Sequence, residues 1–80
     1  MKVEIFCFGA MKEYLPRGKG SSTLVELDDQ ATVADGVDTL GAPRRLVHAI
    51  LVNEDPAGLT TTLKDGDRLT LMPHYSGGGA

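Results

Sequence analysis

Three consecutive glycines, Gly77, Gly78 and Gly79, are the residues of this 80-residue chain whose position points most directly to chemistry. A carboxylate that must enter the active site of another protein needs a thin, extensible backbone leading to it. Glycine has no Cβ and accepts almost any φ and ψ, so a glycine run can approach a nucleotide phosphate closely. ATP can activate such a carboxylate as an acyl-adenylate, and a sulfur nucleophile can then convert it to a thiocarboxylate. The alternative is a flexible terminus without a role.

Other catalytic arrangements are missing from the sequence, so we expect no enzyme activity of its own. The single cysteine, Cys7, stands between Phe6 and Phe8. An apolar setting raises a thiol pKa, which predicts an inert, packed thiol. His48 and His74 lie in different predicted environments, and no second cysteine is available, so no metal site of recognisable spacing exists. We predict neither a metal site nor a cofactor site.

Length and charge narrow the class of protein further. Eighty residues make one small domain, with little room for a deep pocket beside the core. The net charge of −3 offers none of the counterion release that drives nucleic-acid binding. No stretch approaches the roughly 20 apolar residues of a membrane helix, and the N-terminus is no signal peptide. A lone cysteine suits a reducing compartment. We expect a soluble cytoplasmic carrier, adaptor or binding module.

Alternation of apolar and polar residues predicts four strands, separated by turn residues. They cover residues 2–8, 23–28, 47–52 and 68–72. The third run is apolar on both alternating sets, so its phase stays open. Residues 53–56 have the composition of a turn, and Pro73 ends the last strand because it offers no ladder donor. We therefore divide the chain into a folded domain, residues 1–73, and a flexible glycine-rich tail, residues 74–80.

One amphipathic helix is predicted between the second and third strands. Its apolar stripe consists of Val33, Val37 and Leu40. Thr32 and Asp35 have the spacing of a capping box, with Asp in place of Glu. Gly36 weakens the helix by about 1 kcal/mol relative to alanine, and Gly41 is a natural stop. The fold class is therefore α+β, a mixed sheet of four to five strands packed on one main helix.

Several short segments, in this order and spacing, carry a resemblance to a known family. They are Lys2-Val-Glu-Ile-Phe-Cys-Phe-Gly-Ala10, Val25-Glu-Leu27, Ala31-Thr-Val-Ala-Asp35, Leu51-Val-Asn53, Leu63-Lys-Asp-Gly-Asp67, Leu69-Thr-Leu-Met-Pro73 and Ser76-Gly-Gly78. The most specific part is the Asp-Gly-Asp turn followed by a strand, a proline and Gly-Gly. In these segments the chain resembles the MoaD/ThiS family of ubiquitin-like sulfur carriers, which have the β-grasp fold.

The resemblance implies how the glycines work. Gly78 matches the reactive terminal glycine of the family, and Gly77 matches its neighbour. A ubiquitin-activating-type adenylyltransferase would use ATP to adenylate that glycine. Sulfur would come from a persulfide on a cysteine desulfurase or rhodanese-like donor. The thiocarboxylate would pass to a biosynthetic enzyme for molybdopterin, thiamin thiazole or another sulfur metabolite such as a sulfur-containing amino acid. The ending Leu-Met-Pro-His-Tyr-Ser-Gly-Gly favours a molybdopterin-type acceptor over a thiamin type.

This chain departs from the family pattern at two places. Gly79 and Ala80 follow the Gly-Gly pair, so a peptidase would have to expose Gly78, or alternatively Gly79. Gly36 stands where the family more often has a bulky apolar residue, which predicts a helix that packs less fully.

We expect partners to dock on the sheet face turned away from the helix, together with the tail. The candidate residues are Arg68, Thr70, Met72, Tyr75 and Ser76. Two other functions stay open. One is a ubiquitin-like modifier that forms isopeptide bonds through the same glycine. The other is a binding module that keeps the fold and never activates its tail.

Overall fold

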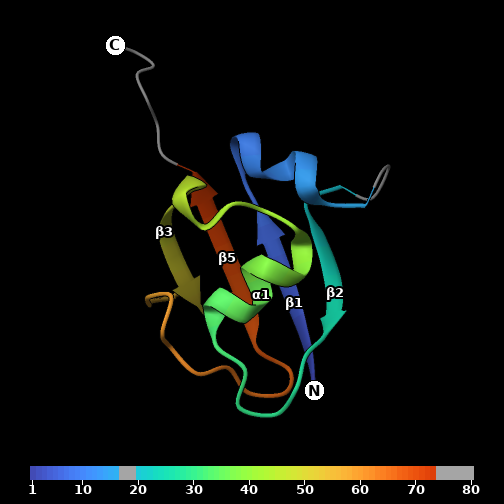
Figure 1. Cartoon of the computed structure of the whole chain (residues 1–80), viewed down its shortest axis with the longest axis vertical. Helices are drawn as coiled ribbons and strands as arrows, with labels where there is room; N and C mark the ends of the chain where they lie inside the picture. Colours follow the sequence, from blue (N-terminus) through green and yellow to red (C-terminus); the bar gives the residue numbers. More distant parts are fainter. Residues whose placement is uncertain (17–19, 74–80) are drawn as a thin grey trace.

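The strands form one mixed sheet in a computed structural model that describes residues 1–16 and 20–73. Their order across the sheet is β2-β1-β5-β3-β4. Figure 1 labels the first four strands of this order. The central neighbours β1 and β5 run parallel, and the other neighbours are antiparallel. The bounds are β1 Lys2–Cys7, β2 Ser22–Glu26, β3 Val47–Val52, β4 Asp55–Pro56 and β5 Arg68–Pro73.

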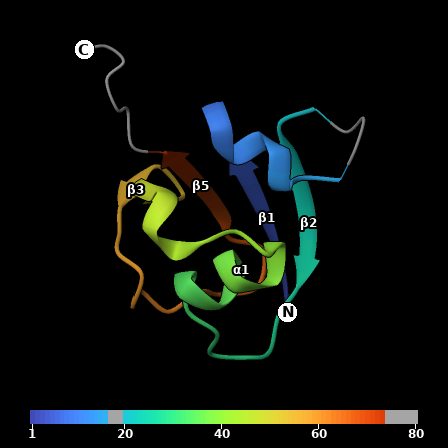
Figure 2. The same ribbon diagram turned by 45° about the horizontal axis from the view of Figure 1, so that its top comes forward.

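One α-helix, α1 (Val33–Leu40), lies across one face of this sheet and leaves the other face open (Figures 1 and 2). Two short 3-10 helices, η1 (Gly9–Tyr14) and η2 (Arg44–Leu46), complete the described elements. This arrangement is the β-grasp fold that the sequence predicts.

The core lies between α1 and the two parallel strands. Alternate residues of β1, and of β5 up to Leu71, are fully buried there together with Val33 and Val37 of the helix, while Leu40 and Pro73 are partly buried. The buried strand residues are Val3, Ile5, Cys7, Leu69 and Leu71. The predicted stripe therefore faces the predicted sheet residues. The side of the sheet that packs against α1 fixes the phase of β1 and β5. A slip of either strand by one residue would turn its apolar side chains away from the core.

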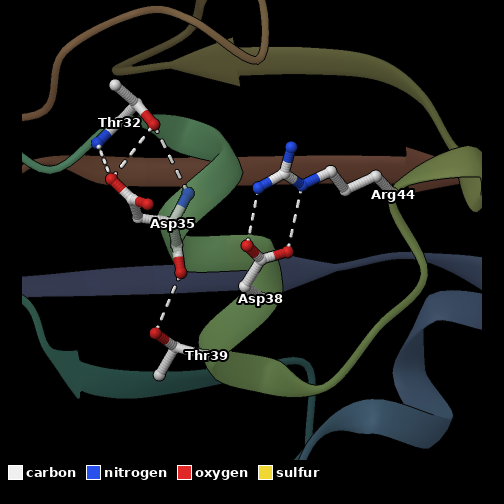
Figure 3. Close-up of polar contacts among 5 residues, drawn as sticks. All are labelled: Thr32, Asp35, Asp38, Thr39 and Arg44. Atoms are coloured by element: carbon white, nitrogen blue, oxygen red, sulfur yellow. Dashed lines mark hydrogen bonds and ion pairs between the residues drawn. The ribbon is translucent and has the colours of Figure 1, made fainter.

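The capping box of α1 is formed as predicted (Figure 3). The backbone N–H of Asp35 donates to the Thr32 hydroxyl at 3.4 Å, and the Asp35 carboxylate accepts the Thr32 backbone N–H at 2.8 Å. Gly41 ends the helix in the left-handed region, at φ 81°. Beyond it, Arg44 donates two hydrogen bonds to Asp38, at 2.7 and 3.0 Å.

Replacement of Thr32 by alanine should lower the free energy of unfolding by about 1 kcal/mol, because the backbone N–H of Asp35 loses its acceptor at the start of α1. Urea unfolding followed by circular dichroism measures this change. Thr39→Ala is the matched control on the same helix. The exposed Thr39 hydroxyl donates to the Asp35 carbonyl at 2.9 Å and caps no helix end. Equal losses in the two variants would contradict the assigned role of the cap.

The predicted loose packing at Gly36 is not what the structure shows. Gly36 is buried, and a Cβ at this position would lie 3.3 Å from Cδ2 of Leu69 and 3.5 Å from Cδ1 of Ile5. Side chains of the sheet already occupy the space that a larger residue would fill. The glycine therefore allows α1 to approach the sheet closely, which offsets its poor helix propensity.

Strand boundaries differ from the prediction at four places, one of them the end of β5, which includes Pro73 and so is one residue longer than the predicted 68–72. Phe8 lies outside β1, because the chain turns at Gly9, whose φ is +55°. The second strand covers 22–26 rather than 23–28, and Leu27 follows it as a core residue. The predicted turn 53–56 is confirmed for its first two residues and wrong for its last two. Asn53 and Glu54 turn the chain with positive φ, but Asp55–Pro56 returns to pair with β3 as the short strand β4.

The predicted tail, residues 74–80, lies outside the described residues. Within 1–16 and 20–73, no helix is long and apolar enough to cross a membrane. In the same part of the chain, no three His, Cys, Asp or Glu side chains gather as a metal site would require.

Candidate functional site

The side of the sheet opposite α1 carries rows of side chains from three strands. Phe6, Thr70 and Leu51 are neighbours across β1, β5 and β3 in the register of the sheet. The next row toward the end of β5 contains Met72, paired with Ala49 of β3. We call this surface the open face and define it as Phe6, Phe8, Ala49, Leu51, Arg68, Thr70 and Met72.

Two shallow pockets hollow the open face, and Phe8 lines both of them. The larger, of about 480 Å³, is lined by Phe6, Phe8, Leu51, Glu54, Arg68 and Thr70. The smaller, of about 250 Å³, is lined by Phe8, Gly9, His48, Ala49, Met72 and Pro73. The side chain of Phe8 is 49% exposed, although large aromatic side chains are usually buried. An apolar, hollowed surface of this kind is typical of a protein docking site.

Arg68 supplies the positive charge of the open face. Its guanidinium carbon lies 5.6 Å from the centre of the Phe6 ring, within the range of a cation–π contact. This contact orients the guanidinium beside the larger pocket, where Glu54 also lies. The face therefore offers apolar contact together with a cation that can pair with a carboxylate of a partner.

The end of β5 is held against the turn after β1. The backbone N–H of Phe8 donates to the Leu71 carbonyl at 3.1 Å. A Cβ at Gly9 would lie only 3.0 Å from Cγ of Pro73, and the φ of +55° also disfavours any other residue. Glycine is thus required at this corner for two reasons. Pro73, the last residue of β5, is consequently fixed at the border of the smaller pocket.

Cys7 takes no part in the open face, because its side chain points into the core and is fully buried. Desolvation by this burial raises the pKa of the Cys7 thiol to about 11. The thiol is therefore protonated at neutral pH and a poor nucleophile, as the sequence predicts.

The raised pKa of Cys7 predicts a pH dependence of stability. Its ordinary value is 9.0, so the folded state holds the thiol proton more tightly than the unfolded state between pH 9.0 and about 11. The contribution is complete below pH 9 and is lost as the pH rises through the folded value, by about 2–3 kcal/mol. Urea unfolding from pH 8 to 11 measures it. Cys7→Ala should have a lower free energy of unfolding throughout, but this free energy should fall less steeply with pH than that of the unchanged protein. Parallel plots of the free energy of unfolding against pH for the two proteins would contradict the prediction.

The structure brings the predicted residues Arg68, Thr70 and Met72 together on the open face. The remaining predicted site residues, Tyr75, Ser76, Gly77, Gly78 and Gly79, lie outside the described residues.

Sequence reasoning missed Phe6, Phe8, Ala49 and Leu51 as members of this face. The alternation of β1 could have identified Phe6, since it falls between the inward-facing Ile5 and Cys7. No comparable signal exists in β3, where both alternating sets are apolar and the register shifts between Val47 and Ala49.

Comparisons with known proteins agree with this fold. A family model named Mut7-C ubiquitin matches residues 1–77. SAMP1 from Haloferax volcanii, a small archaeal modifier protein, is 28% identical, with a TM-score of 0.74 over 98% of this chain and 100% of that chain. A chain from the complex of subunits 1 and 2 of molybdopterin-converting factor from Helicobacter pylori is 27% identical. Its TM-score is 0.60 over 98% of this chain and 100% of that chain.

A search of curated protein sequences found no match. The family model, however, spans nearly the whole chain, and the sheet order with its single covering helix is that of the β-grasp. The chain therefore belongs to the Mut7-C ubiquitin family, among the MoaD/ThiS-like ubiquitin-like proteins.

Proposed function

We propose that this protein is a sulfur carrier that works as a covalent substrate of partner enzymes and not as an enzyme itself. Its reactive group is the carboxylate of Gly78, with Gly77 as the slender residue before it. The partners are a ubiquitin-activating-type adenylyltransferase that uses ATP, a persulfide donor and an acceptor enzyme of the molybdopterin-synthase kind. The similarity to a chain of the Helicobacter pylori molybdopterin-converting factor complex supports this choice of acceptor.

The observation that carries the proposal is the position of Pro73. This residue ends β5 and also lines the smaller pocket of the open face. Gly78 follows five residues later, and five extended residues span at most about 18 Å. A partner that docks on the open face can therefore hold its active site within reach of Gly78. Docking and chemistry use one side of the molecule, as a carrier requires.

The chemistry balances without any group from the folded domain. The Gly78 carboxylate oxygen attacks the α-phosphorus of ATP, and pyrophosphate leaves. The terminal sulfur of a donor persulfide attacks the acyl carbon, and AMP leaves, so that an acyl disulfide forms. A second thiol of the donor then attacks that disulfide, which releases the thiocarboxylate and leaves the donor oxidised. The domain contributes binding and orientation.

Thiocarboxylate formation tests this function. The chain ending at Gly78 is incubated with the adenylyltransferase of the same organism, ATP and a persulfide donor. Intact mass should increase by one oxygen-to-sulfur exchange. The same chain with Gly78→Ala is the control, because its carboxylate is free but a Cβ stands beside it. The adenylyltransferase must first be shown to be active, by pyrophosphate release with a carrier protein that it is known to use. If that active enzyme adds no sulfur to the Gly78 chain, the proposal is contradicted.

A second candidate is a ubiquitin-like modifier, which the similarity to SAMP1 favours. The same adenylate would then be attacked by a lysine amine of another protein. In the assay, this reaction adds the mass of the whole carrier to an acceptor protein, and no sulfur enters the free chain. The two functions thus differ in their products, although both use Gly78.

A further inference from the structure

Strand β2 forms one border of the sheet, and among the described residues no other strand lies along its outer edge (Figures 1 and 2). The phase of its hydrogen bonds follows from Leu27, whose N–H donates to the Met1 carbonyl at 2.8 Å. In an antiparallel ladder, every second residue bonds to the same neighbour, so Val25 and Thr23 also face β1. The residues between them direct both N–H and C=O away from the sheet. These are Ser22, Leu24 and Glu26.

The outer edge of β2 lacks proline, lysine and a β-bulge, three of the features that usually block strand pairing. Within residues 1–16 and 20–73, no backbone hydrogen bond reaches the outward groups of Leu24 or Glu26. The five residues of β2 contain no proline and no lysine, and their register with β1 is unbroken. Its central residue, Leu24, is 67% exposed. Natural proteins normally protect such an edge, because it is a template for another strand.

The charge beside this edge indicates which kind of strand it accepts. A groove of about 510 Å³ lies between the segment after β2 and the outer side of α1. Five carboxylates line it, from Glu26, Asp28, Asp29, Asp35 and Asp38. Glu26 pairs with the N-terminal amine at 3.0 Å, Asp35 caps the helix and Asp38 pairs with Arg44. Asp28 and Asp29 have exposed side chains beside the end of β2.

We propose that the edge of β2 binds an extended segment of a partner protein that carries lysine or arginine at alternate positions. The segment adds to the sheet as a sixth strand, about 4.8 Å from β2, and exchanges backbone hydrogen bonds with Leu24 and its outward neighbours. Its side chains then alternate between two surroundings. The basic ones extend toward the carboxylate-lined groove, and the apolar ones cover Leu24. The edge is separate from the open face, so this site does not depend on the proposed sulfur chemistry.

Charge decides against a second copy of this chain as the occupant. Each copy has a net charge of −3, so a second copy is repelled as a whole, whereas a basic segment is attracted. The backbone groups at the edge could pair with a second copy of β2 or with a basic segment of another protein. The carboxylates of the groove favour the basic segment.

Amide exchange with a defined probe tests the site. The probe is an acetylated, amidated peptide of about six residues, the usual length of a strand, that alternates lysine with valine. Its binding should slow the exchange of the Leu24 and Glu26 amides by at least about tenfold, since exchange then requires the added strand to open. The amides of Thr23 and Val25 already bond to β1 and should change little. A peptide alternating glutamate with valine should protect none of them.

Two variants distinguish strand addition from charge attraction alone. Leu24→Pro removes an N–H that points outward, so the β1–β2 ladder keeps its bonds while the edge loses a donor. Leu24→Thr keeps that donor and is the matched control. The Asp28→Asn, Asp29→Asn double variant leaves the strand untouched and should weaken binding of the lysine peptide about threefold or more, with a smaller salt dependence.

Three results would overturn the proposal. The first is equal binding of the acidic and basic peptides. The second is a lysine peptide whose binding leaves the Leu24 and Glu26 amides unprotected. The third is protection that grows with protein concentration in the absence of peptide, which would assign the edge to a second copy.

Discussion

A chain that ends at Gly78 is expected to acquire sulfur, whereas the chain that continues through Ala80 is expected to acquire none. A thiocarboxylate forms only on a free α-carboxylate, and in the longer chain that group belongs to Ala80. The Cβ of alanine would have to enter the active site of the adenylyltransferase, where we expect the approach to the ATP phosphates to admit only glycine. Two further residues also displace the carboxylate by up to about 7 Å. The difference should therefore be close to all-or-none.

The measurement compares chains that end at Gly78, Gly79 and Ala80, using the same adenylyltransferase with ATP. Pyrophosphate release reports the adenylate, and intact mass reports the exchange of oxygen for sulfur. The chain ending at Gly79 is the informative intermediate, because it lacks the alanine Cβ and is one residue too long. Adenylation of the Ala80 chain as fast as the Gly78 chain would show that no trimming by a peptidase is needed.

Changes on the open face should weaken docking to the adenylyltransferase without changing the chemistry. The variant Phe8→Ala, Arg68→Glu loses an exposed aromatic anchor and reverses the charge beside the larger pocket. Anchors of this type often contribute 2 kcal/mol or more, so KM for the carrier should rise about 30-fold or more while kcat stays nearly constant. A loss in kcat with unchanged KM would instead point to a misplaced tail.

Two controls accompany this variant. Arg45→Glu reverses an exposed charge on η2, outside the open face, and should leave KM unchanged. Phe8→Leu keeps an apolar side chain in both pockets and should recover much of the affinity. Circular dichroism establishes that each variant is folded. If Arg45→Glu raised KM as much as the Phe8→Ala, Arg68→Glu variant, general charge attraction rather than the open face would explain the effect.

The sequence by itself determined the local features of this protein, because each depends on residues close together in the chain. The capping box needs only Thr32 and Asp35, three residues apart, and Gly41 ends the helix through its own backbone conformation. The buried positions of β1 and β5 followed from simple alternation, since only one alternating set in each is mostly apolar. The glycines that carry the proposed chemistry also stand together in the sequence.

Tertiary structure decided which surfaces remain exposed, because that depends on contacts between distant segments. Only pairing with β5 settles that Ile50 and Val52 of β3 face the core while Ala49 and Leu51 face outward. A shift in register between Val47 and Ala49 interrupts the simple alternation there, so no count along the chain could have predicted it. The phase of an apolar strand is a property of its neighbours.

The two interaction surfaces likewise arise from the order of strands in space. The parallel pairing of β1 with β5 places Phe8 and Gly9 beside Pro73, more than sixty residues later in the chain, and so joins the open face to the start of the glycine tail. The position of β2 at the border of the sheet leaves Leu24 exposed. Alternation identifies which side chains share a face, but only the packing of α1 on one side and the strand order decide which face and which edge stay free.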